Sequence, residues 1–260
     1  MKPTSGGNTR DGLILQRARG ALSRIIADHR LGREAVRVTV EPLSPEQAIG
    51  RPCRPGFALA EGQEVMVEAE FRGSFGQAFT DHPRSFEGTI EDVQQLALDT
   101  SDNRAVFIST LNAVASHLGM IEGTQHCRDD DPERCGSQIA SRLLRDFGEV
   151  RIGLVGFQPA LLAHLAEHFG ANNIRCTDLN RRNIGSRRYE VDIDNGRTAT
   201  GHVVNWSDLL LVTGSAIVNG TFDDISEAAA SGEKALLVFG VTGAGTAALL
   251  GLKRVCPFAR

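Results

Sequence analysis

The chain has 260 residues, of which 41% are hydrophobic and 23% are charged, and its formal net charge at pH 7 is −4. At roughly 100–200 residues per domain, this length allows one large domain or two small ones. The slightly acidic balance argues against a nucleic-acid-binding protein, because such proteins normally carry a net positive charge on the binding domain.

The amino-terminal part combines helices with alternating strands. Apolar residues at helical spacing predict helices, and apolar residues that alternate with polar ones predict strands. In chain order, the predicted elements are a helix over 12–30, a strand around Val36, Val38 and Val40, strands over 64–71 and 75–80 joined by a turn at Gly73-Ser74, and helices over 90–98 and 104–118. Together they predict an α+β unit in which a small antiparallel sheet lies beside helices.

After Gly148 the pattern changes to alternating strands and helices. The predicted elements are strands over 150–155, 173–177, 209–212 and 234–239, helices over 159–169, 221–230 and 246–252, and a hairpin whose turn is Asn195-Gly196. Strands that alternate with helices predict a parallel, doubly wound sheet. The fold class is therefore α/β, with one domain over residues 1–148 and a second over 149–260.

The composition of individual segments argues against export and against a membrane protein. Residues 1–12 are polar and lack the apolar segment of a secretory signal. Residues 235–252 carry no charge, but four glycines and two threonines interrupt them, which favours a strand, a turn and a short helix over a spanning helix. The five cysteines are an odd number and include no CxxC pair, so a disulfide framework is not expected. We expect a cytoplasmic protein.

The first strand–helix junction of the second half contains Gly156, at the place of a dinucleotide fingerprint. The G-x-G-x-x-G pattern is absent, so a nucleotide-dependent oxidoreductase is disfavoured. Asp178 ends the next strand, where an acidic residue can bind ribose hydroxyls or cap a turn. Both residues are candidate ligand-binding residues, and a nucleotide-type cofactor stays open.

Two further junctions are rich in small and polar residues. One contains Thr213, Gly214, Ser215 and Asn219, and the other contains Gly243. Because the carboxyl ends of parallel strands meet at one edge of the sheet, these groups converge where open α/β sheets bind ligands. Free amides at helix starts suit an anionic group. The alternative is ordinary turn chemistry.

The segment from His126 to Cys135 is the candidate metal site. Thiolate and imidazole together suit a transition metal, and Cys135 lies in the first turn of a predicted helix, where the thiolate is favoured. His126, Cys127 and Cys135 are the candidate ligands. The alternative interpretation is a buried cysteine next to a solvated acidic loop. Asn112, within the predicted helix over 104–118, is a candidate buried polar residue.

Three of these stretches carry a resemblance to a known family. The dipeptide Asn112-Ala113, the strand over 152–156 and above all the run from Leu211 to Thr221 resemble the family labelled "putative heavy-metal chelation". The resemblance implies a domain similar to the enolase amino-terminal fold, followed by a Rossmann-like domain. It also implies a cleft between them, lined by the Rossmann loops and by amino-terminal residues such as Asn112.

These observations leave two functions open. One is a small-molecule enzyme or binding protein of metal-chelator or cofactor metabolism, whose ligand lies in the interdomain cleft. The other is a protein that sequesters or delivers a metal ion through His126, Cys127 and Cys135. No acid–base pair is evident, so neither a reaction nor catalytic residues are assigned. The expected partners are a small molecule or a metal chelate and a second copy of the chain as a homodimer, but neither nucleic acid nor a membrane.

Overall fold

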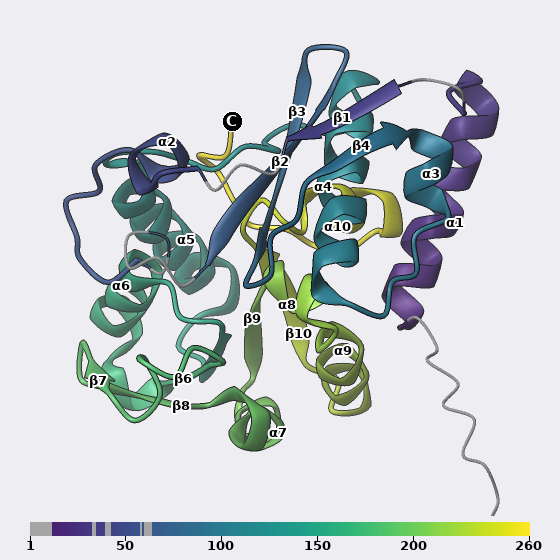
Figure 1. The fold of residues 1–260 in the computed structure, drawn as a ribbon. Helices are drawn as coiled ribbons and strands as arrows, with labels where there is room; N and C mark the ends of the chain where they lie inside the picture. Colours follow the sequence, from purple (N-terminus) through teal and green to yellow (C-terminus); the bar gives the residue numbers. More distant parts are fainter. Residues whose placement is uncertain (1–11, 33–34, 40–42, 58, 60–63) are drawn as a thin grey trace, which may run out of the picture.

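The computed structural model describes residues 12–32, 35–39, 43–57, 59 and 64–260. Two β-sheets, each accompanied by helices, make up this part of the chain (Figure 1). Each sheet lies entirely on one side of Gly148, because the first contains strands between residues 35 and 89 and the second contains strands between residues 152 and 239. Residues 1–11 and Val40, which belong to sequence predictions above, lie outside the described residues.

The first sheet is antiparallel throughout. Its strands are β1 (Ala35–Thr39), β2 (Val65–Phe71), β3 (Ser74–Thr80) and β4 (Phe86–Thr89), in the order β3-β2-β1-β4. The β2–β3 turn is formed by Arg72 and Gly73, with φ values of 51° and 80°, as a tight hairpin requires. The predicted strand pair and the predicted turn region are therefore confirmed.

Helices of the amino-terminal part pack against this sheet and against each other. The long helix α4 (Ser101–His117) lies across β2 and β3 and is buried over most of its length. The others are α1 (Leu13–His29), α2 (Pro45–Ile49) and α3 (Ile90–Gln94). The helix predicted over 90–98 is thus shorter in the structure, since α3 ends at Gln94.

The second sheet is parallel apart from one short edge strand. Its strands are β5 (Ile152–Val155), β6 (Ile174–Asp178), β7 (Arg187–Arg188), β8 (Val191–Asn195), β9 (Leu209–Thr213) and β10 (Ala235–Phe239), in the order β10-β9-β5-β6-β8-β7. From β5 the chain adds strands first toward β8 and then, from β9, on the other side. The carboxyl ends of β5 and β9 therefore border a topological switch point, where such sheets bind ligands.

Two helices cover one face of the parallel sheet. These are α5 (Asp131–Phe147) and α6 (Pro159–Phe169), which pack against each other (Figure 1). Leu154 and Leu211 of the strands share an apolar cluster with Ile139 of α5 and Leu165 of α6. A single turn of 3-10 helix, η1 (Ala171–Asn173), then leads into β6.

The opposite face of the parallel sheet carries α7 (Gly196–Trp206), α8 (Ser215–Asn219) and α9 (Phe222–Ser231). Here Val155 and Val212 belong to a cluster that also contains Val204 of α7, Phe222 of α9 and Leu111 of α4. The apolar core on this face is thus shared between both parts of the chain. The last helix, α10 (Ala244–Leu250), contacts α4 and α1.

One sequence prediction in this region is wrong. Asn195-Gly196 does not turn a hairpin, because Asn195 ends β8 and caps α7, its side-chain oxygen accepting the Arg197 N–H at 2.9 Å. Asparagine is common both at helix N-caps and in hairpin turns, so the dipeptide alone does not distinguish the two structures.

The uncharged stretch 235–252 contains β10, a turn and the short helix α10, as predicted. Within the described residues, every helix is too short or too polar to cross a bilayer.

Candidate functional site

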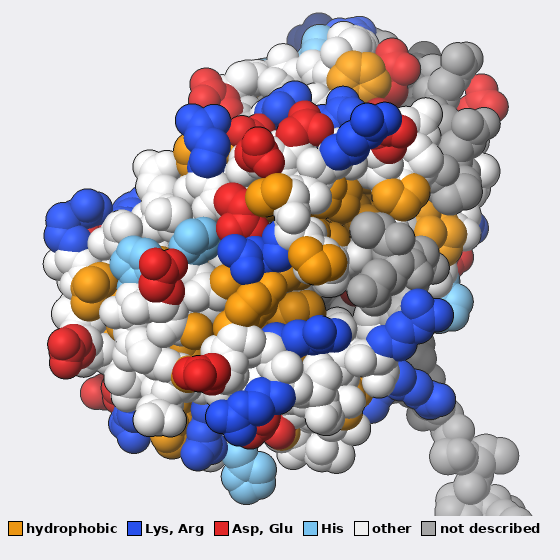
Figure 2. Space-filling view, turned by 90° about the vertical axis from the view of Figure 1, so that its left-hand side faces the viewer, with side chains coloured by type: hydrophobic (Ala, Val, Ile, Leu, Met, Phe, Trp, Pro, Cys, Tyr) orange, Lys and Arg blue, Asp and Glu red, His pale blue; other side chains and the backbone are white. Residues whose placement is uncertain are grey.

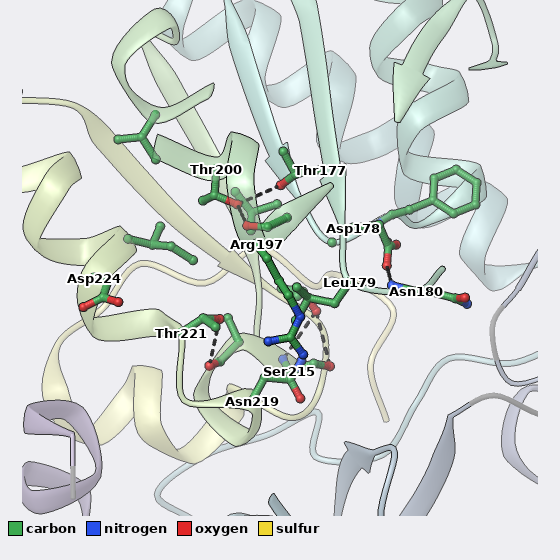
Figure 3. A pocket seen from close by; sticks show the side chains of 18 of the residues that line it. Thr177, Asp178, Leu179, Asn180, Arg197, Thr200, Ser215, Asn219, Thr221 and Asp224 are labelled. Carbon is green, nitrogen blue, oxygen red and sulfur yellow. Dashed lines mark hydrogen bonds between the residues drawn. The ribbon is translucent and has the colours of Figure 1, made fainter. Parts of the chain in front are cut away.

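A cavity of about 440 Å³ lies at the carboxyl ends of β5, β6 and β9, under α7, α8 and α9 (Figure 3). An adjoining hollow of about 350 Å³ shares part of its lining and extends to the end of β3 and the start of α4. Volumes of this size are typical of small-molecule sites. The cavity therefore occupies the sheet edge that the sequence predicts for a ligand.

Gly156 allows β5 and β9 to approach each other closely at this edge. Its φ is +94°, and a Cβ at this position would lie 2.5 Å from the Thr213 Cγ2 atom. The Gly156 N–H donates to the Thr177 carbonyl of β6 at 2.8 Å. Gly156 and Thr213 both line the cavity, and glycine is required at the first of these positions by conformation and by space.

Asp178 lines the cavity and also fixes the loops around it. One carboxylate oxygen accepts the Phe157 N–H at 2.9 Å, and the other accepts the Asn180 N–H at 2.6 Å. Burial raises the pKa of Asp178, although these hydrogen bonds oppose the shift. The carboxylate for which the sequence leaves ribose binding and turn capping open thus holds the β5–α6 loop against the end of β6.

Polar side chains of the β9–α8 junction face the same cavity. The hydroxyls of Thr213 and Ser215 lie 3.4 Å apart. Asn219, the last residue of α8, also lines the cavity, and among the described residues its carboxamide has no hydrogen-bond partner. Three of the residues predicted from this run, Thr213, Ser215 and Asn219, therefore lie in one cavity and carry polar groups that can bind a ligand.

Arg197 is a cavity residue that the sequence did not identify. It extends from α7 toward Ser215 and Asn219 (Figure 3). Within the described part of the chain, its guanidinium group forms neither an ion pair nor a hydrogen bond. An unpaired guanidinium in a cavity is suited to a carboxylate or phosphate of a ligand.

Glu64 is the second residue that sequence reasoning missed. It precedes β2 and lines both the cavity and the adjoining hollow. Burial, together with the negative charges of Asp178 and Asp81, raises the pKa of Glu64 from 4.5 to about 7. In the sequence, Glu64 belongs to the polar positions of an alternating strand, which favours a solvent-exposed side chain. A carboxyl group that titrates near neutral pH can both donate and accept a proton.

Replacing Glu64 by glutamine is expected to stabilise the protein above neutral pH. The raised pKa means that the folded state loses stability relative to the unfolded chain as the pH rises from about 4.5 to about 7. Glutamine does not ionise, so the variant lacks this loss of stability. The Glu64→Gln variant should therefore gain about 2 kcal/mol of unfolding free energy over the wild type at about pH 8, and little at about pH 4.

Urea denaturation at both pH values measures this difference. Glu227→Gln is the matched control, since Glu227 is an exposed residue of α9 outside the cavity lining. A gain at high pH that is equally large in the control would contradict the assignment of the effect to Glu64.

Three predicted ligand-binding residues lie outside the cavity lining. Asn112 is fully buried in α4. Its amide nitrogen donates to the carbonyls of Gln77 at 3.0 Å and Val241 at 3.2 Å, and its oxygen accepts the Gly245 N–H at 2.7 Å. Gly214 and Gly243 pack backbone against backbone, because a Cβ on Gly214 would lie 2.3 Å from the Gly243 nitrogen.

The predicted metal ligands line a separate cavity of about 50 Å³ on the α5–α6 side of the sheet. His126, Cys127 and Cys135 meet there with Cys256, which the sequence did not connect to them. The His126 Nδ1 atom lies 2.5 Å from the Cys127 carbonyl, and burial lowers the pKa of His126. Their donor atoms do not meet the spacing of a preformed metal site in the described residues.

The pKa values of the thiols in this cavity shift in different directions. The Cys135 thiol donates to Cys256, and this hydrogen bond together with burial raises the pKa of Cys135. The same bond and the charge of Arg254 lower the pKa of Cys256 to about 6. Burial raises the pKa of Cys127. Burial and the Cys256 contact thus oppose the thiolate that the place of Cys135 in the first turn of α5 favours.

Comparison with known proteins gives a family match over part of the chain and a similar fold. A family model described as "Putative heavy-metal chelation" (DUF364) matches residues 140–250. The chain is similar to the crystal structure of a DUF364 protein of unknown function from Pyrococcus horikoshii, with a TM-score of 0.53 and 17% identity over 89% of this chain and 80% of that chain.

A second similar structure is a DUF364 protein of unknown function from Desulfitobacterium hafniense DCB-2. Its TM-score is 0.52, with 10% identity over 91% of this chain and 83% of that chain. No curated protein matches the sequence. These findings confirm the resemblance that the sequence predicts and the α/β fold class.

Proposed function

We propose that the chain is a small-molecule enzyme that binds a polar ligand with an anionic group in the 440 Å³ cavity. The observation that carries this proposal is the convergence of an unpaired guanidinium, Arg197, with a protonatable carboxyl, Glu64, in one cavity of the described structure. In this proposal the cavity lies between two domains, residues 1–148 and 149–260, since Glu64 comes from the first and Arg197 from the second.

Each part of the lining suits one part of such a ligand. Arg197 would bind its carboxylate or phosphate, and Thr213, Ser215 and Asn219 would orient it by hydrogen bonds. Apolar side chains of α7, α8 and α9 supply the remaining wall, among them Val204. Molecules that chelate metals are rich in carboxylates, so the family description is consistent with a ligand of this class.

Glu64 supplies the chemistry of the proposed enzyme. A group whose pKa is close to 7 is populated in both protonation states at neutral pH, which favours general acid–base catalysis. Burial, and then the neighbouring carboxylates of Asp178 and Asp81, keep its pKa in this range. A positively charged ligand group bound next to Glu64 would lower its pKa and favour the base form.

A thermal-shift screen tests the proposal. The probes are small carboxylic acids and phosphate esters, and a ligand of the cavity should raise the Tm of the wild type. Arg197→Gln should weaken its binding by about tenfold or more, which corresponds to roughly 1.4 kcal/mol. Arg188→Gln is the matched control, because Arg188 is an exposed residue of β7 outside the cavity. Equal Tm shifts in both variants would contradict the proposal.

A second function, sequestration of a soft metal ion, rests on the cavity that contains Cys127, Cys135 and Cys256. Three thiols with a nearby imidazole form a donor set that suits such ions once a bound cation has displaced the protons. Metal analysis of the untagged, reduced protein distinguishes the two functions. A thiol-bound metal should be lost in Cys127→Ser and retained in Arg197→Gln.

A further inference from the structure

A cluster of histidine and glutamate side chains lies on α6, on the side of the sheet opposite the 440 Å³ cavity. His164, Glu167 and His168 are spaced by three and four residues, so they share one face of the helix. Each offers one donor atom, and these atoms all lie within 4.8 Å of one another. Figure 2 shows this side of the molecule, where histidine and acidic side chains lie next to each other.

Within the described part of the chain, one ring nitrogen of His164 makes no hydrogen bond. Its Nε2 atom lies 3.3 Å from a carboxylate oxygen of Glu133 on α5, and its Nδ1 atom lies 3.3 Å from a carboxylate oxygen of Glu167. The Nδ1 atom is buried, and its geometry forms no hydrogen bond with any residue that the structure describes. With the ring proton on the Nε2 side, a lone pair of Nδ1 faces the negative charge of Glu167. A cation between them would satisfy both.

Neighbouring groups orient both imidazole rings through hydrogen bonds. Arg54 binds Glu133 through two hydrogen bonds, which orients the carboxylate that faces His164. The His168 Nδ1 atom lies 2.8 Å from the His164 carbonyl oxygen, so its proton is used there. The Nε2 lone pair faces the Ser141 hydroxyl at 3.1 Å, and a bound ion would take the place of that hydrogen bond. Metal-binding histidines typically donate their second ring N–H to a carboxylate or a backbone carbonyl.

We propose that His164, Glu167 and His168 bind a divalent transition-metal ion of the Zn²⁺ class on the outer face of α6. Two imidazoles and one carboxylate form a donor set that zinc uses, with a fourth position left for water or a ligand. The exposed side chain of Glu167, at 71% exposure, leaves the site accessible from solvent. This site involves none of the residues of the proposed function, so either proposal can fail without the other.

Titration with Co²⁺, followed by absorption, tests the site. Cobalt replaces zinc in nitrogen and oxygen sites and gives weak visible bands, whereas thiolate ligands add strong charge-transfer absorption in the near ultraviolet. We expect one equivalent of Co²⁺ to bind the reduced wild type without the thiolate signal. His164→Gln and His168→Gln should each weaken binding by at least about tenfold.

Two further variants test whether Co²⁺ binding is specific to the α6 residues. His202→Gln should bind Co²⁺ like the wild type, because His202 is an exposed histidine on α7. Glu167→Gln changes a solvent-exposed side chain, so it should weaken binding while the circular dichroism spectrum stays unchanged. The proposal is overturned if the wild type binds no Co²⁺, if binding is unaffected in both histidine variants, or if the thiolate signal accounts for all of the bound ion.

Discussion

Replacing Asn112 by alanine is expected to lower the free energy of unfolding by about 3 kcal/mol. The side chain is fully buried and joins α4 to the backbone of β3 and of the β10–α10 loop. Its removal leaves the Gly245 N–H without its partner in the interior and takes a donor from the Gln77 and Val241 carbonyls, and an unpaired buried group costs roughly 1–3 kcal/mol. Urea denaturation of the two proteins measures the loss.

Asn103 provides the comparison on the same helix. Its amide donates to the Ala97 carbonyl at 2.8 Å near the surface, so Asn103→Ala should cost about 1 kcal/mol or less. If Asn112→Ala instead kept its stability and lost only ligand-induced stabilisation, the role in ligand binding predicted from the sequence would be favoured over the structural one.

Replacing Gly214 by alanine should cost about 3 kcal/mol or more. The backbone of Gly214 is helical, with φ −58° and ψ −24°, so the cost arises from space rather than from conformation. The new methyl group would lie 2.3 Å from the Gly243 nitrogen and 2.9 Å from its Cα atom. Because backbone cannot rotate away as a side chain can, the loops that follow β9 and β10 must separate.

Gly20→Ala is the matched substitution. Gly20 lies within α1, and a Cβ there would meet nothing within 4 Å, so alanine should stabilise the helix by about 0.5–1 kcal/mol. Opposite signs for the two variants in urea denaturation are the expected result. A neutral effect of Gly214→Ala would show that the two loops can move apart freely.

The sequence predicts the order and type of most elements, because their apolar periodicity is strong. Where a local signal has two physical meanings, tertiary context decides between them. Asn195-Gly196 is one case, since a helix cap replaces the predicted hairpin. Cys135 is another, since burial and its contact with Cys256 oppose the effect of the helix dipole on its thiol.

The position of the 440 Å³ cavity follows from topology, but much of its chemistry does not. Strand order alone brings Gly156, Thr213 and Ser215 to one edge, which the sequence anticipates. Glu64 and Arg197 reach this edge from distant parts of the chain, so no local pattern marks them. Cys256 joins Cys127 for the same reason. Such residues are identified by what surrounds them in space.

The packing of α5 bears on which fragments of this protein can fold alone. The helix precedes Gly148, yet Ile139 and Leu143 share the apolar cluster of the parallel sheet. A fragment that began at residue 149 would keep α6 but lose α5, and would expose the part of the apolar face that α5 covers, which promotes aggregation. On the other face, Leu111 of α4 packs in the same cluster as Val212 of β9. Cutting the chain at Gly148, where the pattern of predicted elements changes, would therefore divide a shared apolar core. An evolutionary exchange of either half would have to restore the contacts of that core.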